Sequence, residues 1–280
     1  MIATGWKDYR ILATADGEKL EMWKDVCLLR PDPQVIWKGK INPSKADARY
    51  IRNSSGGGEW KFNKRIPDEW TVCWKDLKFL IKPMGFKHVG LFPEQSVNWA
   101  LMTDIIKKSQ NQVNVLNLFA YTGGATVACA KAGAKVTHVD AAKGMVERAG
   151  QNATLSEIPR DRIRYIIDDC KKFVMREIKR GKKYNAIIMD PPSYGRGPGG
   201  ELWKIEDSLF DLVQLTTQVL EEPVFYLINS YTTGLQPSVI ENILRLNLKQ
   251  FGGKFDSYEV CLPTDEGIVL PCGCSGLWQK

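Results

Sequence analysis

The turn Asp190-Pro-Pro-Ser-Tyr194 contains candidate catalytic residues and directly follows an apolar run. Pro191 and Pro192 lack a backbone N–H and fix the turn, so carbonyl oxygens and the Asp190 carboxylate are left to face an approaching amine or base. An aromatic ring just behind such a turn can stack on a base, although Ser193 separates Tyr194 from the prolines here. The sequence therefore predicts a catalytic clamp made by Asp190, Pro191, Pro192 and Tyr194, with a rigid turn at a strand end as the alternative.

A second candidate site is the glycine turn that ends Val113-Asn-Val-Leu-Asn-Leu-Phe-Ala-Tyr-Thr-Gly-Gly124. Its apolar start indicates a buried parallel strand, and the glycines permit a tight backbone that lets a ligand approach the next helix. A nicotinamide-binding turn would need glycine at Tyr121 and Thr126, and the Gly-Lys-Ser/Thr of a phosphate-binding loop is absent. The free amide groups of the next helix suit a ligand carboxylate. The ligand-binding residues predicted here are Asn117, Phe119, Ala120, Tyr121, Thr122 and Gly123.

Two further carboxylates follow the next predicted strands. Asp140 lies 23 residues beyond Asn117, close to the spacing of about 20 that ribose-binding acids show in doubly wound folds. Its two oxygens can accept both ribose hydroxyls. Asp169 follows the third strand and could accept from an adenine amino group. Asp168 competes for that role, and capping of the next helix is the alternative for either aspartate.

Strands and helices alternate from residue 113 onward. The predicted strands are 113–119, 136–140, 162–168, 184–189 and 224–230, with closing strands at 255–262 and 267–271. The predicted helices are 125–132, 143–155, 171–180, 206–220 and 237–248. This order predicts an open α/β sheet with an antiparallel end. Because ligands bind outside the carboxyl ends of such strands, the candidate carboxylates should meet at one edge of the sheet.

Residues 1–85 differ from the rest of the chain. They are rich in Trp, Pro and Lys, contain short apolar runs and lack helical periodicity, which predicts a small β-rich domain and a candidate substrate-binding domain. Residues 53–58 are expected to form a flexible loop within it. Residues 86–280 then make up the second domain.

The segment between Trp37 and Arg65 carries eight Lys or Arg side chains interleaved with aromatic rings. Basic groups beside aromatics suit single-stranded RNA, and the net charge of +7 agrees with an acidic partner. Solvated lysines on a β surface would explain the same count without any ligand.

The composition argues against several classes of protein. No apolar run approaches the roughly 18 residues of a membrane span, and the first residues lack a signal peptide, so we expect a cytoplasmic protein without a membrane partner. Seven scattered cysteines fit free thiols in a reducing compartment. Cys272 and Cys274 lack a second ligand pair, and only His88 and His138 could join them, so no metal site is expected.

The chain resembles class I S-adenosylmethionine-dependent methyltransferases, in particular the family of the large-subunit ribosomal RNA cytosine-C5 methyltransferases and their shorter relatives. The motifs that carry the resemblance are Leu116-Asn-Leu-Phe-Ala-Tyr-Thr-Gly123, Thr137-His-Val-Asp140, Asp168-Asp-Cys-Lys-Lys-Phe173 and Met189-Asp-Pro-Pro-Ser-Tyr-Gly-Arg-Gly197. The segment Gly90–Trp99 is similar to the one that lies against the cofactor in this family, which adds Phe92 and Gln95 to the cofactor-binding residues. The resemblance implies a Rossmann-like sheet of seven strands with the last antiparallel, S-adenosyl-L-methionine as cofactor, and contacts to it from Asp140, Asp169 and Asp190.

One position departs from the pattern of the family. Cytosine-C5 methylation needs a cysteine thiolate after the fifth strand, where this chain has Tyr231. Cys272 or Cys274 could supply a thiol, although small buried cysteines are commoner. The resemblance thus implies methylation of a ribosomal RNA base, in free RNA or a ribosomal particle, without naming the atom. The alternatives are a small-molecule or protein side-chain acceptor, or a non-catalytic cofactor-binding module.

The segment Gly195–Lys204 follows the clamp and contains four glycines and a proline in its first six residues. This composition predicts a mobile loop that could close over the site. A plain surface loop is the alternative.

Overall fold

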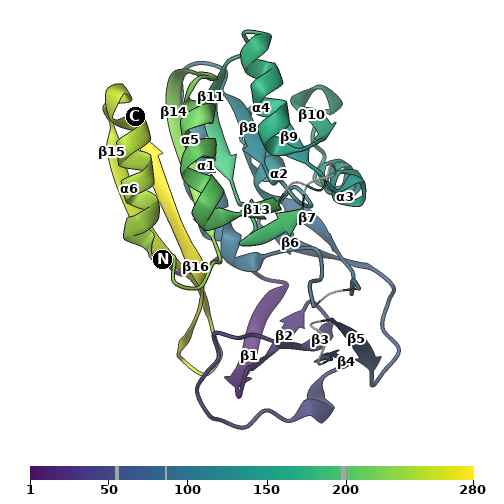
Figure 1. Ribbon diagram of the computed structural model, residues 1–280. Coiled ribbons are helices and arrows are strands. Elements are labelled where there is room, and N and C mark those ends of the chain that lie inside the picture. Colours follow the sequence, from purple (N-terminus) through teal and green to yellow (C-terminus); the bar gives the residue numbers. More distant parts are fainter. Residues whose placement is uncertain (54–56, 86, 197–199, 201) are drawn as a thin grey trace. The chain divides into compact units, whose positions relative to one another are not determined.

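The structure is a computed structural model that describes residues 1–280 apart from 54–56, 86, 197–199 and 201 (Figure 1). The chain forms two compact units, the first made of Met1–Val97 and Val260–Cys272, and the second of Asn98–Glu259 and Gly273–Lys280. The division into domains at 1–85 and 86–280 remains a prediction. The expected flexible loop 53–58 lies partly outside the described residues, and β5 begins at Gly58.

The first unit is built mainly from strands, as the pattern of residues 1–85 predicts. A five-stranded sheet has the order β1 (Tyr9–Ala15), β2 (Glu18–Trp23), β3 (Val26–Pro31), β4 (Ala48–Arg52), β5 (Gly58–Phe62). Its neighbours pair antiparallel except β3 and β4, which are parallel. β6 (Trp70–Trp74) and β7 (Leu77–Ile81) form a separate hairpin, and η1 (Pro43–Lys45) and η2 (Pro93–Gln95) are short 3₁₀ helices.

Residues 260–272 complete this first unit from the far end of the sequence. The backbone N–H of Ala3 donates to Cys261 O at 2.8 Å, and the N–H of Cys261 donates to Met1 O at 2.9 Å. Thr14 donates its backbone N–H to the Glu266 carboxylate at 2.7 Å. The N-terminal strands therefore bind a segment that follows them by about 250 residues in sequence.

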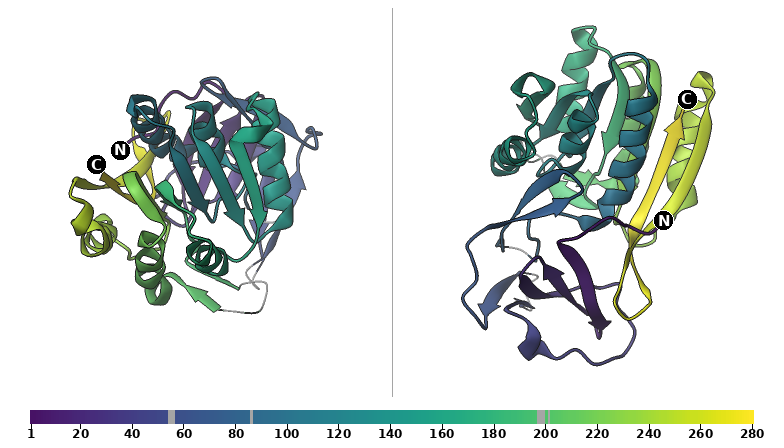
Figure 2. Two further views of the ribbon diagram at one scale, coloured as in Figure 1. Left: turned by 90° about the horizontal axis from the view of Figure 1, so that it is seen from above. Right: turned by 180° about the vertical axis from the view of Figure 1, so that it is seen from behind.

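The second unit contains a seven-stranded sheet of the order β10-β9-β8-β11-β14-β16-β15 (Figures 1 and 2). The strands are β8 (Asn114–Leu118), β9 (Lys135–Asp140), β10 (Ile163–Ile167), β11 (Tyr184–Met189), β14 (Leu220–Ser230), β15 (Lys254–Pro263) and β16 (Val269–Gln279). The four pairings that join β10, β9, β8, β11 and β14 are parallel, whereas β16 runs antiparallel to β14. This confirms the predicted Rossmann-like sheet with an antiparallel last strand.

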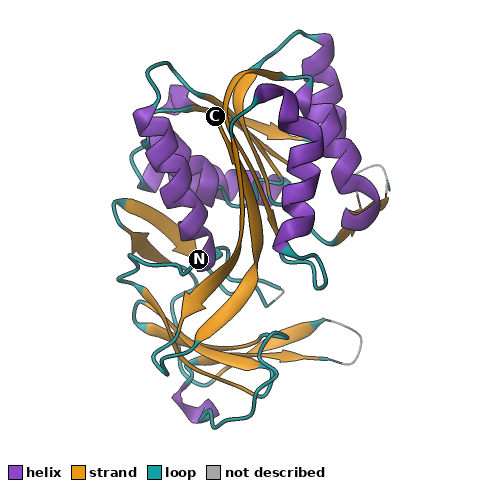
Figure 3. Ribbon diagram, turned by 90° about the vertical axis from the view of Figure 1, so that its left-hand side faces the viewer, coloured by secondary structure: helices purple, strands orange, loops and turns teal. Residues whose placement is uncertain are grey.

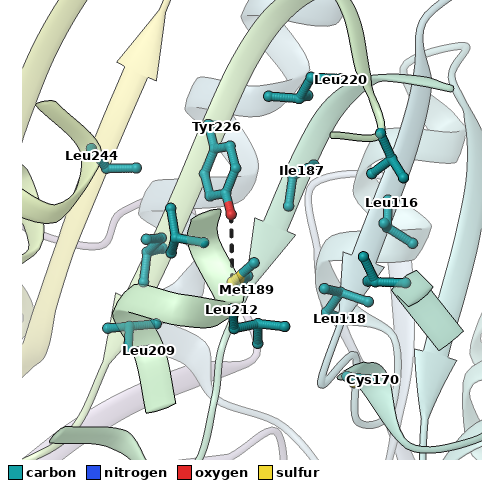
Figure 4. Close-up of a cluster of buried hydrophobic side chains, with 14 of the residues drawn as sticks. Leu116, Leu118, Cys170, Ile187, Met189, Leu209, Leu212, Leu220, Tyr226 and Leu244 are labelled. Carbon is teal, nitrogen blue, oxygen red and sulfur yellow. Dashed lines mark hydrogen bonds between the residues drawn. The ribbon is translucent and has the colours of Figure 1, made fainter. Parts of the chain in front are cut away.

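Helices pack on both sides of this sheet (Figure 3). They are α1 (Ser96–Lys108), α2 (Gly124–Lys131), α3 (Lys143–Leu155), α4 (Cys170–Lys179), α5 (Ile205–Thr217) and α6 (Pro237–Leu248), with the short η3 (Arg160–Arg162) and η4 (Lys249–Phe251). α5 contacts both α4 and α6, and α2 contacts α3. Because helices cover the central strands, those strands are near-continuous apolar runs, as parallel strands buried on both faces require. Figure 4 shows part of this core, including Leu116, Ile187, Met189 and Tyr226.

Three elements differ from the sequence prediction. α1 was not predicted, because Asn98, Thr103 and Asp104 interrupt its apolar pattern. β16 continues to Gln279 although the glycines after residue 271 indicate a break. The segment expected to be a mobile loop instead contains two short paired strands, β12 (Tyr194–Arg196) and β13 (Leu202–Lys204). The central glycines and proline of that prediction lie outside the described residues.

Candidate active site

The loop after β8 adopts a backbone that its side chains disfavour. Phe119 and Tyr121 have φ angles of 54° and 50°, and Gly123 has 83°. Two non-glycine residues in the left-handed region cost free energy, so the surrounding structure must hold them there. The N–H of Phe119 donates to Cys170 Sγ at 3.3 Å, and that of Tyr121 to Asp140 Oδ2 at 2.8 Å. Such held strain is typical of ligand-binding loops.

The two glycines of this loop leave no room for a side chain. A Cβ on Gly123 would lie 2.8 Å from the Cβ of Ala149, and one on Gly124 would lie 2.5 Å from Cζ2 of Trp99. The turn therefore packs directly on α3 and α1, with its backbone close to the start of α2. This close packing makes a tight cradle for the N-terminus of α2, and amides at a helix N-terminus can bind a ligand carboxylate.

The remaining loop positions are fixed by backbone hydrogen bonds. The N–H of Ala120 donates to Val139 O at 3.1 Å, and that of Gly123 to Ala120 O at 3.0 Å. Thr122 is buried, and its carbonyl accepts from Asn152 Nδ2 at 2.8 Å. The predicted cofactor contacts in this loop thus belong to one rigid turn.

Asn117 lies beneath this turn in a buried polar cluster. Its Nδ2 donates to Thr126 Oγ1 at 2.9 Å, and the same hydroxyl lies 2.9 Å from Nδ1 of His138. Burial lowers the pKa of His138 to about 4, so this imidazole is neutral at physiological pH. The direct role of Asn117 toward a cofactor remains a prediction, while its amide supports the start of α2.

Asp140 ends β9 with a carboxylate held by two backbone donors. Oδ2 accepts from Tyr121 N at 2.8 Å and Oδ1 accepts from Ala142 N at 2.9 Å. Burial raises the pKa of this carboxyl group, and the two N–H groups oppose the shift. Each carboxylate oxygen can accept more than one hydrogen bond, so the pair can still receive two hydroxyl groups.

Asp168 and Asp169 have different partners. Asp168 forms an ion pair with Arg176 and accepts the N–H of Asp169 at 2.9 Å. Asp169 is the N-cap of α4, where Oδ1 accepts from Lys172 N at 2.8 Å. The capping alternative is therefore confirmed for Asp169, but one of its oxygens suffices for the cap. Asp169 therefore has more acceptor capacity left than Asp168, and it is the better candidate to accept from an adenine amino group.

Asp190 follows β11 and has one hydrogen-bond partner among the described residues. Asn229 at the end of β14 donates Nδ2 to Asp190 Oδ1 at 2.9 Å. Burial raises the pKa of Asp190 to about 6, and the Asn229 amide only partly opposes this. The group is thus mostly ionised at neutral pH yet basic enough to take up a proton.

The rest of the predicted clamp is fixed on both sides. Pro191 is buried, whereas Pro192 is exposed. The carbonyl of Pro192 was expected to face a substrate, but it accepts the indole N–H of Trp203 at 2.6 Å. Ser193 Oγ bonds Thr232 Oγ1 at 2.7 Å, and Tyr194 is 57% exposed on β12. Tyr194 therefore presents a free ring, while one expected acceptor of the clamp is occupied.

Trp203 connects this clamp to the glycine loop. Its ring centroid lies 5.1 Å from that of Phe119, and its indole nitrogen bonds Pro192. The aromatic type of Trp203 next to the clamp was a signal in the sequence, but both partners depend on tertiary structure. Asn229 was not predicted, although it is a polar residue near the end of an apolar strand, as are Asp140 and Asp190.

Phe92 and Gln95 belong to the first unit. Phe92 directly precedes η2, and its ring centroid lies 5.2 Å from that of His88. Gln95 is the last residue of η2. Burial lowers the pKa of His88 to about 4. The cofactor contacts assigned to Phe92 and Gln95 remain predictions.

The cysteine thiols near the end of the chain are poor nucleophiles. Cys274 is buried, and its Sγ donates to Leu235 O at 3.2 Å. Burial raises the pKa of the Cys274 thiol to about 11 and that of Cys272 well above its usual value. Neither group is present as the thiolate that attack on a base requires.

The described part of the chain shows neither a cluster of metal-binding side chains nor a helix suited to crossing a membrane. No three His, Cys, Asp or Glu side chains of these residues are grouped so that they could hold a metal ion. Within the same residues, none of the helices combines the length and the apolar character that crossing a membrane would require.

The carboxyl ends of the parallel strands meet at one edge of the sheet, as the topology predicts. Residues 46–205, which make up over half of the chain, match the S-adenosylmethionine-dependent methyltransferase family. The chain therefore belongs to this family. A crystal structure of an S-adenosylmethionine-dependent methyltransferase from Agrobacterium tumefaciens is 30% identical with a TM-score of 0.93, and the match covers 100% of this chain and 92% of that one.

Two curated relatives carry ribosomal RNA in their names. The large-subunit methyltransferase K/L of Shewanella frigidimarina is 33% identical over 174 residues, or 60% of this chain and 22% of the relative. A protein of Methanocaldococcus jannaschii, provisionally named a ribosomal RNA large subunit methyltransferase, is 33% identical over 144 residues, or 51% of this chain and 35% of the relative. The match thus spans only about a third or less of the length of these relatives.

S-adenosylmethionine, the cofactor of this family, fits the residues at this edge of the sheet. The N-terminal amide groups of α2 suit a ligand carboxylate, and Asp140 keeps acceptor capacity for ribose hydroxyls. The residues that would hold the cofactor in this unit are those of the loop 119–123 together with Asp140, Asp169 and Asp190.

Proposed function

We propose that this protein transfers a methyl group from S-adenosylmethionine to a base of ribosomal RNA. The observation that carries the proposal is Asp190, a partly buried acceptor at the same strand-end edge as the glycine loop. The names of the relatives matched over this half of the chain support RNA as the acceptor. A cytoplasmic location and an encounter with free ribosomal RNA or a ribosomal particle follow from that acceptor.

The residues of the chain do three things in this reaction. Asp140 orients the bound cofactor through its ribose, and the rigid loop 119–123 excludes water around it. Asp190 accepts an N–H of the acceptor, aims the nitrogen lone pair, and takes up the proton that methylation makes acidic. The cofactor itself supplies a methyl group already activated by the positive sulfur.

We propose a nitrogen rather than a pyrimidine C5 as the target atom. Methylation at C5 would require a thiolate, but Tyr231 occupies the expected position and Cys274 is protonated and bonded to Leu235. A nitrogen acceptor needs only the hydrogen-bond acceptor that Asp190 provides. The exposed ring of Tyr194 is then available to stack on the base.

The first unit supports RNA binding less than its composition suggests. Three of the eight basic groups between Trp37 and Arg65 form ion pairs, which are Lys38–Asp16, Arg49–Glu18 and Lys64–Asp47. Trp37 and Trp60 donate their indole N–H groups to backbone carbonyls, and Tyr50 is buried. Phe62, at 54% exposed, is the ring best able to stack. This pairing favours the second candidate, a small-molecule or protein side-chain acceptor.

The experiment that tests these proposals measures where a labelled methyl group goes. Tritiated S-adenosylmethionine is incubated with the protein and with separated RNA, ribosomes, proteins and metabolites from cells that lack this gene. We expect label in RNA with the wild-type protein and none with Asp190→Ala. Label confined to protein or small molecules would overturn the RNA proposal. Cofactor binding without label in any fraction would indicate a non-catalytic module.

A further inference from the structure

A continuous chain of hydrogen bonds runs through the second unit to Asp190. Asn229 donates Nδ2 to Asp190 Oδ1 at 2.9 Å, and Ser275 Oγ donates to Asn229 Oδ1 at 2.9 Å. Asn98 donates Nδ2 to Ser275 Oγ at 2.9 Å, and the Tyr258 hydroxyl donates to Asn98 Oδ1 at 2.8 Å. Asn98, Ser275 and Asn229 thus each accept from the outer neighbour and donate to the inner one.

Four elements bring these side chains together. Asp190 follows β11, and because Met189 pairs with Ile228, it lies beside Asn229. Asn229 pairs with Ser275 across the antiparallel contact of β14 with β16. Asn98 comes from the first turn of α1 and Tyr258 from β15. Residues from well-separated parts of the sequence therefore form one connected polar chain.

The four side chains that lead to Asp190 in this hydrogen-bonded network are almost completely buried. The exposed fractions are 1% for Asn229, 0% for Ser275, 1% for Asn98 and 9% for Tyr258. Three apolar side chains and a phenyl ring at these positions would avoid the cost of burying polar groups. The polar groups are tolerated because each is bonded, but the fold alone does not require them.

The direction of the bonds gives the chain a function. An amide that points Nδ2 at a carboxylate turns Oδ1 the other way, and Ser275 satisfies that oxygen by donating to it. Asn98 donates to the oxygen of Ser275, and the hydroxyl hydrogen of Ser275 is left to point at Asn229 Oδ1. All donors therefore point toward Asp190, an arrangement that favours the ionised carboxylate because it accepts such a hydrogen bond more strongly than a protonated carboxyl group does.

We propose that Asn229, Ser275, Asn98 and Tyr258 are positioning residues that keep Asp190 ionised and hold one of its oxygens toward the acceptor. This inference rests on the proposed role of Asp190 in methyl transfer. It assigns a purpose to the polar groups on β14, β16, α1 and β15 that the sequence patterns do not explain.

No charge among the described residues does this for Asp190. Burial and the Asn229 amide are the causes that act on its pKa, the first raising it and the second lowering it. Among the four proposed positioning residues, Tyr258 is the titratable one. Burial raises the pKa of its hydroxyl above the usual value, so the hydroxyl remains a donor. The neutral chain is therefore what opposes protonation of the buried carboxylate.

Removing a hydrogen bond in the middle of this side-chain network should weaken its effect on Asp190 and favour the protonated carboxyl group. In Ser275→Ala, Asn229 Oδ1 loses its donor, and the amide can turn to present oxygen to Asp190. That arrangement favours a protonated carboxyl group, so we expect the titration midpoint of Asp190 to rise by about one pH unit. Tyr258→Phe removes only the outermost donor and should give a smaller rise in the same direction.

The test measures the titration directly and then its effect on rate. Carbon-13 NMR of protein labelled at its aspartate carboxyl carbons follows Asp190, whose signal is assigned by its loss in Asp190→Asn. The pH profile of methyl transfer is measured with ribosomal RNA from cells that lack the gene. The matched control is Tyr184→Phe, which removes a buried tyrosine hydroxyl at the opposite end of β11, where it bonds Glu177 at 2.6 Å.

Each outcome decides the inference. An upward shift in Ser275→Ala, a smaller one in Tyr258→Phe and none in Tyr184→Phe would support it, with the loss of rate greatest near pH 6 and nearly absent at pH 9. An unchanged Asp190 midpoint in Ser275→Ala would overturn it, even if the variant were slow. If ribosomal RNA were not methylated at all, the RNA proposal would fail, while the NMR titration would still decide the role of the chain.

Discussion

Two desolvated carboxylates, one in each unit, have opposite electrostatic surroundings. Glu21 in the first unit forms an ion pair with Arg30 and accepts the Tyr9 hydroxyl at 2.8 Å. Burial alone would raise its pKa, but Arg30 and Lys19 outweigh that effect and hold the pKa below its usual value. Asp190 in the second unit has a neutral amide as its partner, and its pKa is raised to about 6. A compensated charge serves the fold, whereas an uncompensated one remains available for chemistry.

The largest expected effect is on the rate after Asp190→Asn. This change keeps the shape of the side chain and removes the proton acceptor, so we expect kcat to fall about 100-fold. Tritium transfer under saturating cofactor and RNA measures it. Asp161→Asn, at an exposed position in η3, is the control and should retain the full rate. A rate within threefold of wild type would remove the distinction between the two carboxylates.

The next effect is on stability after Glu21→Gln. The substitution leaves the Arg30 guanidinium buried without its counter-charge, so we expect the free energy of unfolding to fall by about 3 kcal/mol. Urea denaturation at pH 7 provides the measurement. Asp190→Asn should show no such loss. Equal losses in the two variants would mean that both carboxylates serve the fold.

The glycine loop should be sensitive to a single added methyl group. Gly124→Ala places a Cβ 2.5 Å from the Trp99 ring, and overpacking of this kind costs about 1–3 kcal/mol. We expect cofactor affinity, measured by calorimetry, to fall about tenfold, which corresponds to about 1.4 kcal/mol. Gly150→Ala in α3 is the matched control, because a Cβ there meets nothing within 4 Å. Equal cofactor affinity in both variants would contradict a tight cradle.

The pH dependence of stability should have opposite signs for the two carboxylates. The raised pKa of Asp190 means that its protonated form stabilises the fold at low pH, and this contribution is lost as the pH rises through about 6. The lowered pKa of Glu21 means a contribution that is present at neutral pH and is lost as the pH falls through its folded pKa. Asp190→Asn should therefore be more stable than wild type above pH 6, with the difference disappearing near pH 4. Denaturation curves across this range would detect a slope of the wrong sign.

The smallest effect concerns the clamp. Trp203→Phe keeps an aromatic ring against Phe119 and removes the hydrogen bond to Pro192 O. Loss of one such bond costs about 1 kcal/mol, so we expect KM for the acceptor to rise about fivefold with little change in kcat. Steady-state kinetics separates the two constants. A large fall in kcat instead would place Trp203 at the reacting atoms.

Local patterns in the sequence predicted most of the second unit. The bounds of α3, α6 and β11 agree with the predicted ones, since each has clear periodicity between breakers. Asp140 and Asp190 were found because a carboxylate that ends an apolar strand must lie at one edge of the sheet. The β-rich character of the first unit also followed from its short apolar runs.

Features that depend on distant partners were not predictable in this way. Phe119 and Tyr121 adopt a left-handed backbone that the sequence does not indicate, because neither residue is a glycine. Hydrogen bonds to Cys170 and Asp140 hold this backbone. Ser275 lies 46 residues from Asn229 in sequence, and only the β14–β16 register brings them together. A single sequence records the residue types at such positions but not their pairing.

The split composition of the first unit constrains how the chain can be made. Residues 260–272 supply backbone partners to Ala3 and to Met1 and a carboxylate to Thr14. Domains generally fold in order of synthesis, N-terminal first, as the ribosome extends the chain. Here a nascent polypeptide of 97 residues still lacks the last segment of its own first unit, which is made only after residues 98–259. The hydrogen bonding of the N-terminal strands is therefore completed only after most of the second unit has been synthesised.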